Sequence, residues 1–174
     1  MGRLVIPLSD FSDEVVGVDV SEAMMTEAQK NCTSRNINNC KFILSDDTIS
    51  KVTGKFDFIN SFITFQHIHI KKGEKIIKKM LELLNSNGVG AIHVTYAVVD
   101  KRTYIMNRIM HNSMLSKMLL IKNGKNPFMP VAEINCYNLN RIMQLLQSNN
   151  CTSVTCEFVN HGGNLGTILY FKKN

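Results

Sequence analysis

One short stretch of the chain, residues 15–21, combines an apolar strand, a carboxylate and a helix start. Its apolar run Val15–Val20 predicts a buried parallel strand, and Asp19 falls near the carboxyl end of that strand. Open α/β sheets bind ligands at this edge, where a carboxylate can accept hydrogen bonds from the two hydroxyls of a ribose. Asp19 equally fits the ribose of NAD, or a simple turn before the helix that begins at Ser21. The stretch alone leaves these interpretations open.

The cysteines and histidines show no spacing typical of a disulfide framework or a metal site. The five cysteines are odd in number and form no C-x-x-C pair, which favours a reducing compartment and predicts a cytoplasmic protein. The five histidines are scattered, although His67 and His69 alternate and could share a face, so no metal is expected. His67 is the candidate general base, because an imidazole titrates near neutral pH. A histidine at a strand end with no chemical role is the alternative.

The order of the predicted elements indicates how these residues are positioned. Strands and helices alternate along most of the chain, which is typical of a Rossmann-like α/β fold with a mostly parallel sheet and helices on both faces. A Gly-rich connection joins the last two strands and predicts an antiparallel C-terminal hairpin. The expected strands are 15–20, 41–44, 56–63, 89–96, 154–159 and 167–172. The expected helical segments are 21–32, 71–84, 101–123 and 138–146.

Residues 101–130 form a basic, methionine-rich helical insertion in what is otherwise a single domain, residues 1–174. Basic residues but no acids lie in this insertion, and they account for the net charge of +6, because the remaining basic residues equal the acids in number. Charge confined to one segment does not favour a nucleic-acid partner. Methionines recur every four residues from Met106 to Met118, which predicts either core packing or an adaptable apolar lid. No apolar run is long enough for a membrane span.

Several short motifs follow one another in a definite order. They are Gly2-Arg3-Leu4, Gly17-Val18-Asp19-Val20-Ser21-Glu22-Ala23-Met24, Asp46, Phe56-Asp57-Phe58-Ile59 leading to Gln66-His67-Ile68, and Asn87-Gly88-Val89-Gly90. Together they resemble the class I S-adenosylmethionine-dependent methyltransferases, in particular the small methyltransferase-domain group. The match covers residues 2–96, and the predicted C-terminal hairpin resembles the reversed last strand of that family. The resemblance implies S-adenosylmethionine as cofactor and a small molecule as acceptor, with no membrane partner; it does not determine the oligomeric state.

The resemblance also implies which residues contact the cofactor. Asp19 would bind the ribose hydroxyls with Val20 beside it, and Met24 would pack near the ribose and adenine. Asp46 would lie near the adenine amino group, with Asp47 as its neighbour. Ordinary structural roles remain open for these residues: Met24 also suits the core side of a helix, and the two consecutive acids also suit a solvated turn.

A second group of residues would border the methyl-transfer cleft. The resemblance places residues 61–67 there, with Ser61 on the cofactor side. Gln66 and Tyr96 are the candidates for contact with the acceptor, and His67 is the candidate base. The enzyme mainly positions the acceptor, because the cofactor itself carries the activated methyl group.

The chain departs from the family pattern at its beginning. In the family a first strand and a Gly-rich loop precede the Gly-Arg motif, and the loop cradles the amino-acid half of the cofactor through close backbone contact. Here Gly2 and Arg3 directly follow Met1, so we expect a truncated form with the first strand and Gly-rich loop missing and activity impaired. Two alternatives stay open: a catalytically inactive methyltransferase-like binding or scaffold protein, and an NAD-binding oxidoreductase fragment. A nucleic-acid methyltransferase is less favoured, because Asn60-Ser61-Phe62-Ile63 stands where its N/D-P-P-Y/F motif would be.

Overall fold

The chain folds as two compact units, Met1–Gly54 and Lys55–Asn174, each with its own sheet. The computed structural model describes residues 2–100, 104–105, 108–109, 113–124, 126 and 134–174. No helix in these ranges has both the length and the apolar character needed to cross a lipid bilayer.

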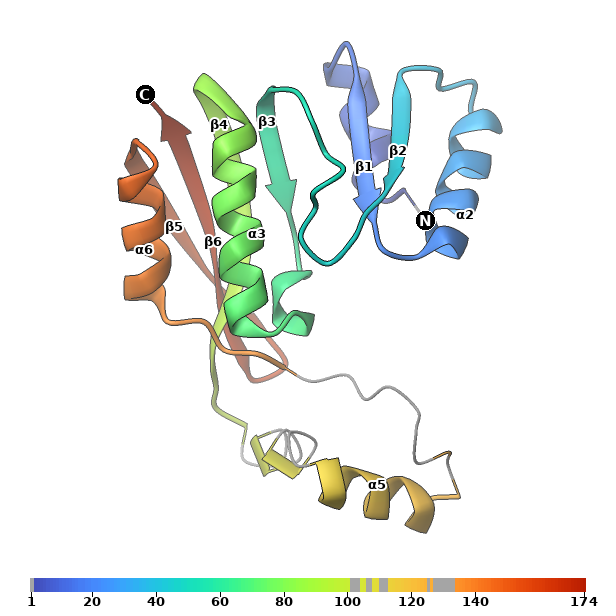
Figure 1. The fold of residues 1–174 in the computed structure, drawn as a ribbon, viewed down its shortest axis with the longest axis vertical. Helices are drawn as coiled ribbons and strands as arrows, with labels where there is room; N and C mark the ends of the chain where they lie inside the picture. The colour runs from blue at the N-terminus through green and yellow to red at the C-terminus, as the bar shows by residue number, and fades with distance from the viewer. Residues whose placement is uncertain (1, 101–103, 106–107, 110–112, 125, 127–133) are drawn as a thin grey trace. The chain divides into compact units, whose positions relative to one another are not determined.

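The first unit is a parallel strand pair with helices packed against it (Figure 1). Its elements are α1 (Val5–Leu8), the 3-10 helix η1 (Ser9–Phe11), β1 (Val15–Asp19), α2 (Glu22–Thr33) and β2 (Cys40–Leu44). Gly17 lets β1 run close beneath α1, because a Cβ there would lie 2.8 Å from the Phe42 ring and 3.1 Å from Val5. Ala28 and Cys32 are the buried residues of α2. The predicted strand–helix–strand order of this region is confirmed.

The second unit is a four-stranded mixed sheet. Its elements are β3 (Phe56–Ser61), η2 (Phe65–His67), α3 (Ile70–Leu83), β4 (Leu84–Val98), α5 (Ser113–Lys122), α6 (Leu139–Ser148), β5 (Cys151–His161) and β6 (Asn164–Lys173). The strand order is β3-β4-β6-β5, with β3 and β4 parallel and the two pairs that involve β6 antiparallel. The predicted α/β class and the closing antiparallel hairpin are therefore confirmed.

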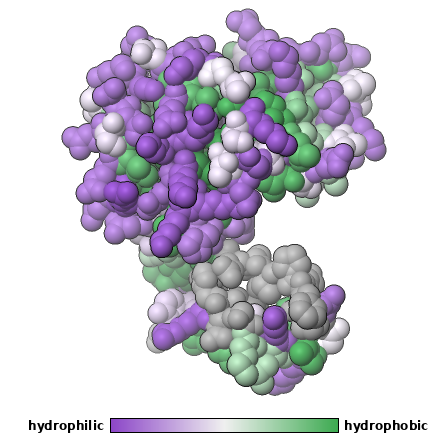
Figure 2. Space-filling model, viewed as in Figure 1, coloured by the Kyte–Doolittle hydropathy of each residue, from purple (hydrophilic) through white to green (hydrophobic). Residues whose placement is uncertain are grey.

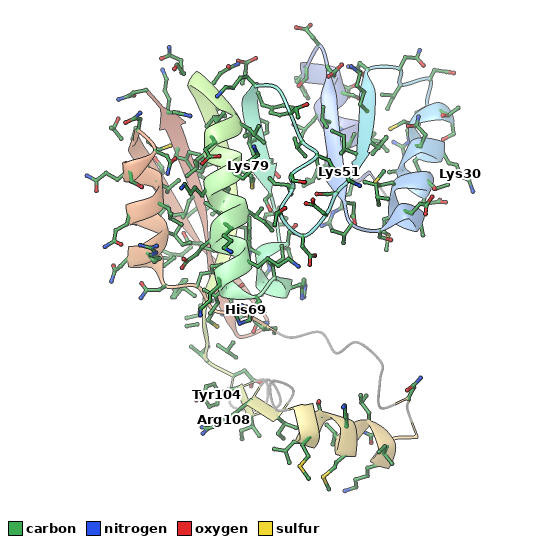
Figure 3. The ribbon with its side chains drawn as sticks, in the orientation of Figure 1. Lys30, Lys51, His69, Lys79, Tyr104 and Arg108 are labelled. Carbon is green, nitrogen blue, oxygen red and sulfur yellow. The ribbon has the colours of Figure 1, made fainter. Side chains whose placement is uncertain are left out.

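Two amphipathic helices, α3 and α6, cover the same face of this sheet (Figure 1). The apolar residues of α3 and α6 meet strand residues that point toward them. The buried set is Ile76, Ile77, Met80, Leu81, Ile92, Val94, Ile142, Leu146, Leu169 and Phe171. The outward surface of the two helices is largely hydrophilic (Figure 2), and Lys79 of α3 is labelled in Figure 3. The apolar stripe that predicted α3 thus packs on the sheet, while the lysine side of the helix faces outward.

The start of β4 differs from the prediction. The strand begins at Leu84 rather than Val89, because Leu84 already pairs with Phe56 before regular pairing resumes at Phe58 and Val89. The predicted turn residues between them form a bulge, in which Asn87 adopts a left-handed φ of 65°. Asparagine tolerates that conformation better than most residues. The predicted turn therefore exists, but as a bulge within β4 rather than as a break before the strand.

The methionine-rich segment is only partly described. Met114 and Met118 of α5 are exposed, and Ser116 and Leu120 are its buried residues. Tyr104 and Arg108, labelled in Figure 3, are also exposed. The core-packing alternative therefore does not apply to Met114 and Met118, whereas Met106 and Met110 lie outside the described residues.

Candidate active site

Asp19 ends β1 at the edge that the sequence predicts. Its carbonyl oxygen accepts a hydrogen bond from the Ser45 amide at 2.8 Å, which holds the ends of β1 and β2 together. Its carboxylate Oδ1 accepts from the Ser21 amide at 2.9 Å. Among the described residues no group donates to Oδ2, and the side chain is exposed. Asp19 thus forms the turn before α2 and still presents a carboxylate oxygen to a ligand.

Three exposed apolar side chains lie on the elements that flank Asp19. Val20 is 66% exposed and Met24 is 41% exposed, although both are residues that usually lie in a core. Leu44, directly opposite Asp19 in the strand register, is 37% exposed. Met24 lies in the first turn of α2, where the Ser21 hydroxyl accepts its amide hydrogen at 3.4 Å. A carboxylate bordered by exposed apolar side chains suits a ligand that combines hydroxyls with a flat apolar ring.

Asp46 organises the turn that follows β2. Its Oδ1 accepts hydrogen bonds from the amides of Thr48 and Ser50, at 2.9 and 3.0 Å, and from the Thr48 hydroxyl. The Ser50 hydroxyl donates to Oδ2. These bonds, led by the Ser50 hydroxyl, hold the pKa of the Asp46 carboxyl far below its usual range. Asp47, the second predicted acid, is exposed in the same turn.

The loop after β3 is tied to two other parts of the second unit. Gln66 accepts a hydrogen bond from the Thr95 hydroxyl at 3.2 Å through its side chain, and from the Asn135 amide at 2.8 Å through its carbonyl. The Tyr137 amide donates to the Thr95 carbonyl at 2.7 Å, and the Tyr137 hydroxyl donates to the Ile68 carbonyl at 2.7 Å. We call this set of contacts the loop clasp. It gives Gln66, predicted as an acceptor contact, a clear structural role.

The other predicted residues of the second unit lie around this loop and the neighbouring strands. His67 is exposed, and its Nε2 lies 3.1 Å from Nε2 of Gln66. Ser61 ends β3 and pairs with Ile92 of β4. Tyr96 is half-buried in β4, with its ring 6.2 Å from that of Phe158.

The predicted residues thus fall into two sets, one in each unit. Val20 and Met24 gather around Asp19, with Asp46 and Asp47 on the next turn, and the second unit brings Gln66 and His67 together. In the described part of the chain, no group of three His, Cys, Asp or Glu side chains could hold a metal ion. All five cysteines are free thiols.

The sequence interpretation missed several residues of these sites. Leu44 was predicted only as a strand residue. Its place at the end of the second strand, in register with the acid that ends the first, could have indicated a role beside Asp19. Asn135 and Tyr137 could not be found from local patterns, because each contacts a loop 69 residues earlier in the chain. His93 was noted only as one of the scattered histidines.

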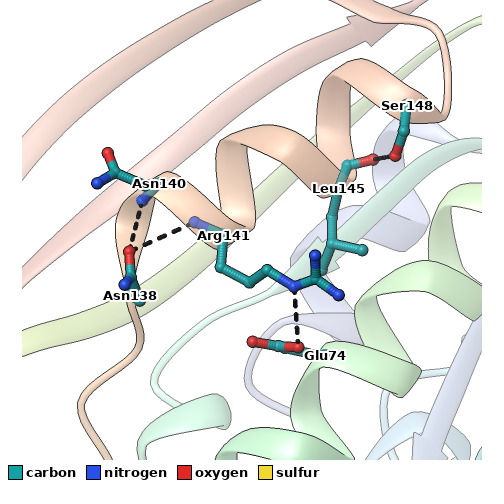
Figure 4. A network of polar contacts seen from close by, with 6 residues as sticks. All are labelled: Glu74, Asn138, Asn140, Arg141, Leu145 and Ser148. Atoms are coloured by element: carbon teal, nitrogen blue, oxygen red, sulfur yellow. Dashed lines mark hydrogen bonds and ion pairs between the residues drawn. The ribbon is translucent and has the colours of Figure 1, made fainter.

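α6 is positioned beside this clasp by its own polar contacts (Figure 4). Asn138 caps the helix by accepting hydrogen bonds from the amides of Asn140 and Arg141, at 3.0 and 3.4 Å. Nε of Arg141 lies 3.4 Å from a carboxylate oxygen of Glu74 on α3. Asn138 is the N-cap of α6 and directly follows the clasp residue Tyr137. The cap therefore fixes the start of the helix next to the residue that holds the loop.

Comparison with known proteins identifies the family. Residues 1–88 match the family model described as "Methyltransferase domain", whereas no curated protein matches the chain. Among solved structures, magnesium protoporphyrin IX methyltransferase (ChlM) from Synechocystis, with bound SAH, is 19% identical with a TM-score of 0.69; the alignment covers 99% of this chain and 69% of that one. TehB from Haemophilus influenzae is 16% identical with a TM-score of 0.67, and the shares are 99% and 54%.

A SAM-dependent methyltransferase from Methanosarcina mazei is 14% identical with a TM-score of 0.66, and the shares covered are 99% and 87%. The chain thus spans from about half to most of the length of these proteins, and at such identities the likeness establishes the fold. The family match, which covers just over half of the chain, selects the methyltransferase interpretation over the NAD-binding oxidoreductase. The chain therefore belongs to the methyltransferase-domain family and has the α/β fold of S-adenosylmethionine-dependent methyltransferases.

Proposed function

We propose that this chain binds S-adenosylmethionine at the carboxyl edge of β1 and β2 and transfers its methyl group to a small molecule. Family membership supports the reaction class, and the ChlM structure, which contains SAH, supports the cofactor. The observation that carries the proposal is the exposed Asp19 carboxylate, which keeps one oxygen open among exposed apolar side chains.

The residues of the first unit fit a nucleoside. Asp19 Oδ2 would accept hydrogen bonds from the ribose hydroxyls, while Oδ1 stays bonded to the Ser21 amide. Val20, Met24 and Leu44 would contact the faces of the ribose and adenine with apolar atoms. Asp46 and Asp47 would border the adenine amino group. Because the Asp46 carboxylate already accepts from Thr48 and Ser50, its contribution there is to hold the turn in shape.

The residues of the second unit would act on the acceptor. When bound, S-adenosylmethionine supplies a methyl group made reactive by a positively charged sulfur, so the protein must align an acceptor and accommodate its proton. The exposed His67 would act as the general base, Ser61 would contact the cofactor, and Gln66 and Tyr96 would contact the acceptor. A small-molecule acceptor is supported by the name of the ChlM relative, which specifies magnesium protoporphyrin IX.

Calorimetric titration with SAH and with S-adenosylmethionine tests the cofactor site. Asp19→Asn keeps an oxygen for the Ser21 amide but removes the charge that strengthens the ribose bonds. One charge-assisted hydrogen bond contributes about 1.5–3 kcal/mol, so we expect binding to weaken by about 10- to 100-fold. Asp13→Asn, an exposed acid of the same unit, is the matched control and should bind like wild type.

Two results would contradict the proposal: no heat of SAH binding with wild-type protein, or equal affinities for wild type and Asp19→Asn. Conversion of S-adenosylmethionine to SAH in the presence of acceptors then separates an enzyme from a scaffold. A scaffold would bind SAH with the same dependence on Asp19 and form none of it.

A further inference from the structure

His93 lies in the middle of β4 and has no hydrogen-bond partner in the described structure. The residue is fully buried, and neither Nδ1 nor Nε2 contacts a donor or acceptor there. Leaving a buried polar group unpaired costs about 1–3 kcal/mol. Such a cost in a folded protein needs an explanation, and a ligand that supplies the missing partner is one of the standard ones.

The surroundings of His93 are aromatic and leave room for the imidazole. The Phe62 ring centroid is 5.5 Å from that of His93, and the His161 ring centroid is 5.3 Å away. Gly166 makes room for the ring, because a Cβ there would overlap Nε2 of His93 and lie 3.1 Å from Cε1. Burial, and secondarily the nearby His161, lower the pKa of His93. At neutral pH the ring is therefore uncharged, with one N–H donor and one nitrogen that accepts.

The position of His93 in the sheet relates it to the proposed transfer site. In the parallel register of β3 and β4, Ser61 pairs with Ile92, so His93 lies beside Phe62, directly after β3 ends. This is the edge at which parallel strands bind ligands. Asn164 pairs with His161 across the hairpin, and its buried Oδ1 also lacks a hydrogen-bond partner among the described residues. The side-chain nitrogen of Asn164 donates to the His161 carbonyl at 3.1 Å.

We propose that His93 recognises the methyl acceptor by accepting a hydrogen bond from its aromatic hydroxyl, while the Phe62 and His161 rings hold the flat apolar part. An uncharged imidazole suits a neutral phenol-type group better than a carboxylate or phosphate, which would need a cation. His161 is exposed and directly precedes the Gly162–Gly163 turn, so this ring borders solvent on one side and His93 on the other. This inference rests on the proposed methyltransferase function and adds the class of its acceptor.

Nitrogen-detected NMR of the histidine rings tests the proposal with phenol as the probe. We expect phenol to shift the His93 ring nitrogens saturably and those of His161 to a smaller extent. Toluene, which has the same ring without the hydroxyl, should leave the His93 nitrogens unchanged. In His93→Gln we expect at least about tenfold weaker phenol binding, the equivalent of one lost hydrogen bond. If His93→Gln does not fold, His161→Ala provides a second test. It replaces an exposed residue, removes one of the two aromatic rings and should also weaken phenol binding.

His69→Ala, an exposed histidine of the same unit, is the control and should bind phenol like wild type. The proposal is overturned if phenol and toluene act alike, if no saturable shift occurs at His93, or if the ring nitrogens prove to be bonded only to a buried water that phenol does not displace. SAH titration of the same samples separates the two proposals. Intact SAH binding without a phenol response at His93 refutes this inference alone, and a phenol response without SAH binding refutes only the cofactor proposal.

Discussion

Replacement of Gly73 by alanine is expected to destabilise the protein, although general helix propensity predicts the opposite. Gly73 lies within α3, where alanine is favoured over glycine by about 1 kcal/mol. A Cβ at this position, however, would overlap the hydroxyl oxygen of Tyr137 and lie 2.8 Å from its Cζ atom. Tyr137 is 2% exposed and packed, so it cannot move without breaking contacts.

The size of the effect follows from the contacts that Tyr137 would lose. Its hydrogen bond to the Ile68 carbonyl, 2.7 Å long, is worth about 1–3 kcal/mol when its loss leaves a buried group unpaired. The edge-to-face contact with Phe65, at 6.0 Å, adds about 0.5–1.5 kcal/mol. After the propensity gain is subtracted, Gly73→Ala should lower the free energy of unfolding by about 2 kcal/mol. For a chain of this length that corresponds to a fall in Tm of roughly 4–8 °C.

Thermal and urea unfolding followed by circular dichroism measure this loss. Lys75→Ala, an exposed change on the same helix, is the control and should alter stability by less than about 0.5 kcal/mol. In a Tyr137→Phe background the hydroxyl is gone, so adding Gly73→Ala should cost at least about 1 kcal/mol less than in wild type. A higher Tm for Gly73→Ala, or equal losses in the two backgrounds, would show that the hydroxyl does not occupy this space and that the clasp is wrongly described.

Three further predictions concern a helix cap and two titrating groups. Asn138→Ala should lower the free energy of unfolding by about 1 kcal/mol in urea unfolding, because two amides of α6 lose their acceptor; an unchanged midpoint would contradict the cap. The Asp46 carboxyl has a strongly lowered pKa, so its stabilisation is complete above the unfolded value of about 3.9 and is lost only as pH falls below it. The amide shifts of Thr48 and Ser50 should accordingly stay constant from neutral pH down to about 4. The lowered pKa of His93 means that the unfolded chain binds its proton first, so stability should fall as pH drops below about 6.5, and His93→Gln should flatten that part of the Tm–pH profile.

Local patterns were enough to predict most of the helices and strands. The apolar run of β1, the Ser21 cap and the two-faced pattern of α3 each carry their own structural signal, and the structure contains all three. The position of Asp19 at the end of β1 was predictable for the same reason, because the acid follows an apolar run directly. The turn at residues 85–88 was recognised but assigned outside β4, since no local pattern reveals the pairing of Leu84 with Phe56.

The contacts of the loop clasp were harder to predict, because they join distant parts of the chain. Gln66 was selected by motif alone, whereas its structural partners Thr95 and Asn135 come from β4 and from the segment before α6. His93 drew no attention, because a histidine within an apolar strand looks like an ordinary core residue. Only the structure reveals that Phe62 and His161 pack around it and that, among the described residues, its two ring nitrogens have no hydrogen-bond partner.

The loop clasp and a second backbone hydrogen bond attach the chain on either side of residues 101–133. The chain is held just before residue 101, where the Val99 amide donates to the Gly163 carbonyl at 2.9 Å, and again just after residue 133, where the Asn135 amide donates to Gln66. Both of these hydrogen bonds join backbone groups, so they do not depend on the side chains at positions 99 and 135. Substitution at position 99 or 135 should therefore leave the loop that carries Gln66 and His67 attached to its neighbours.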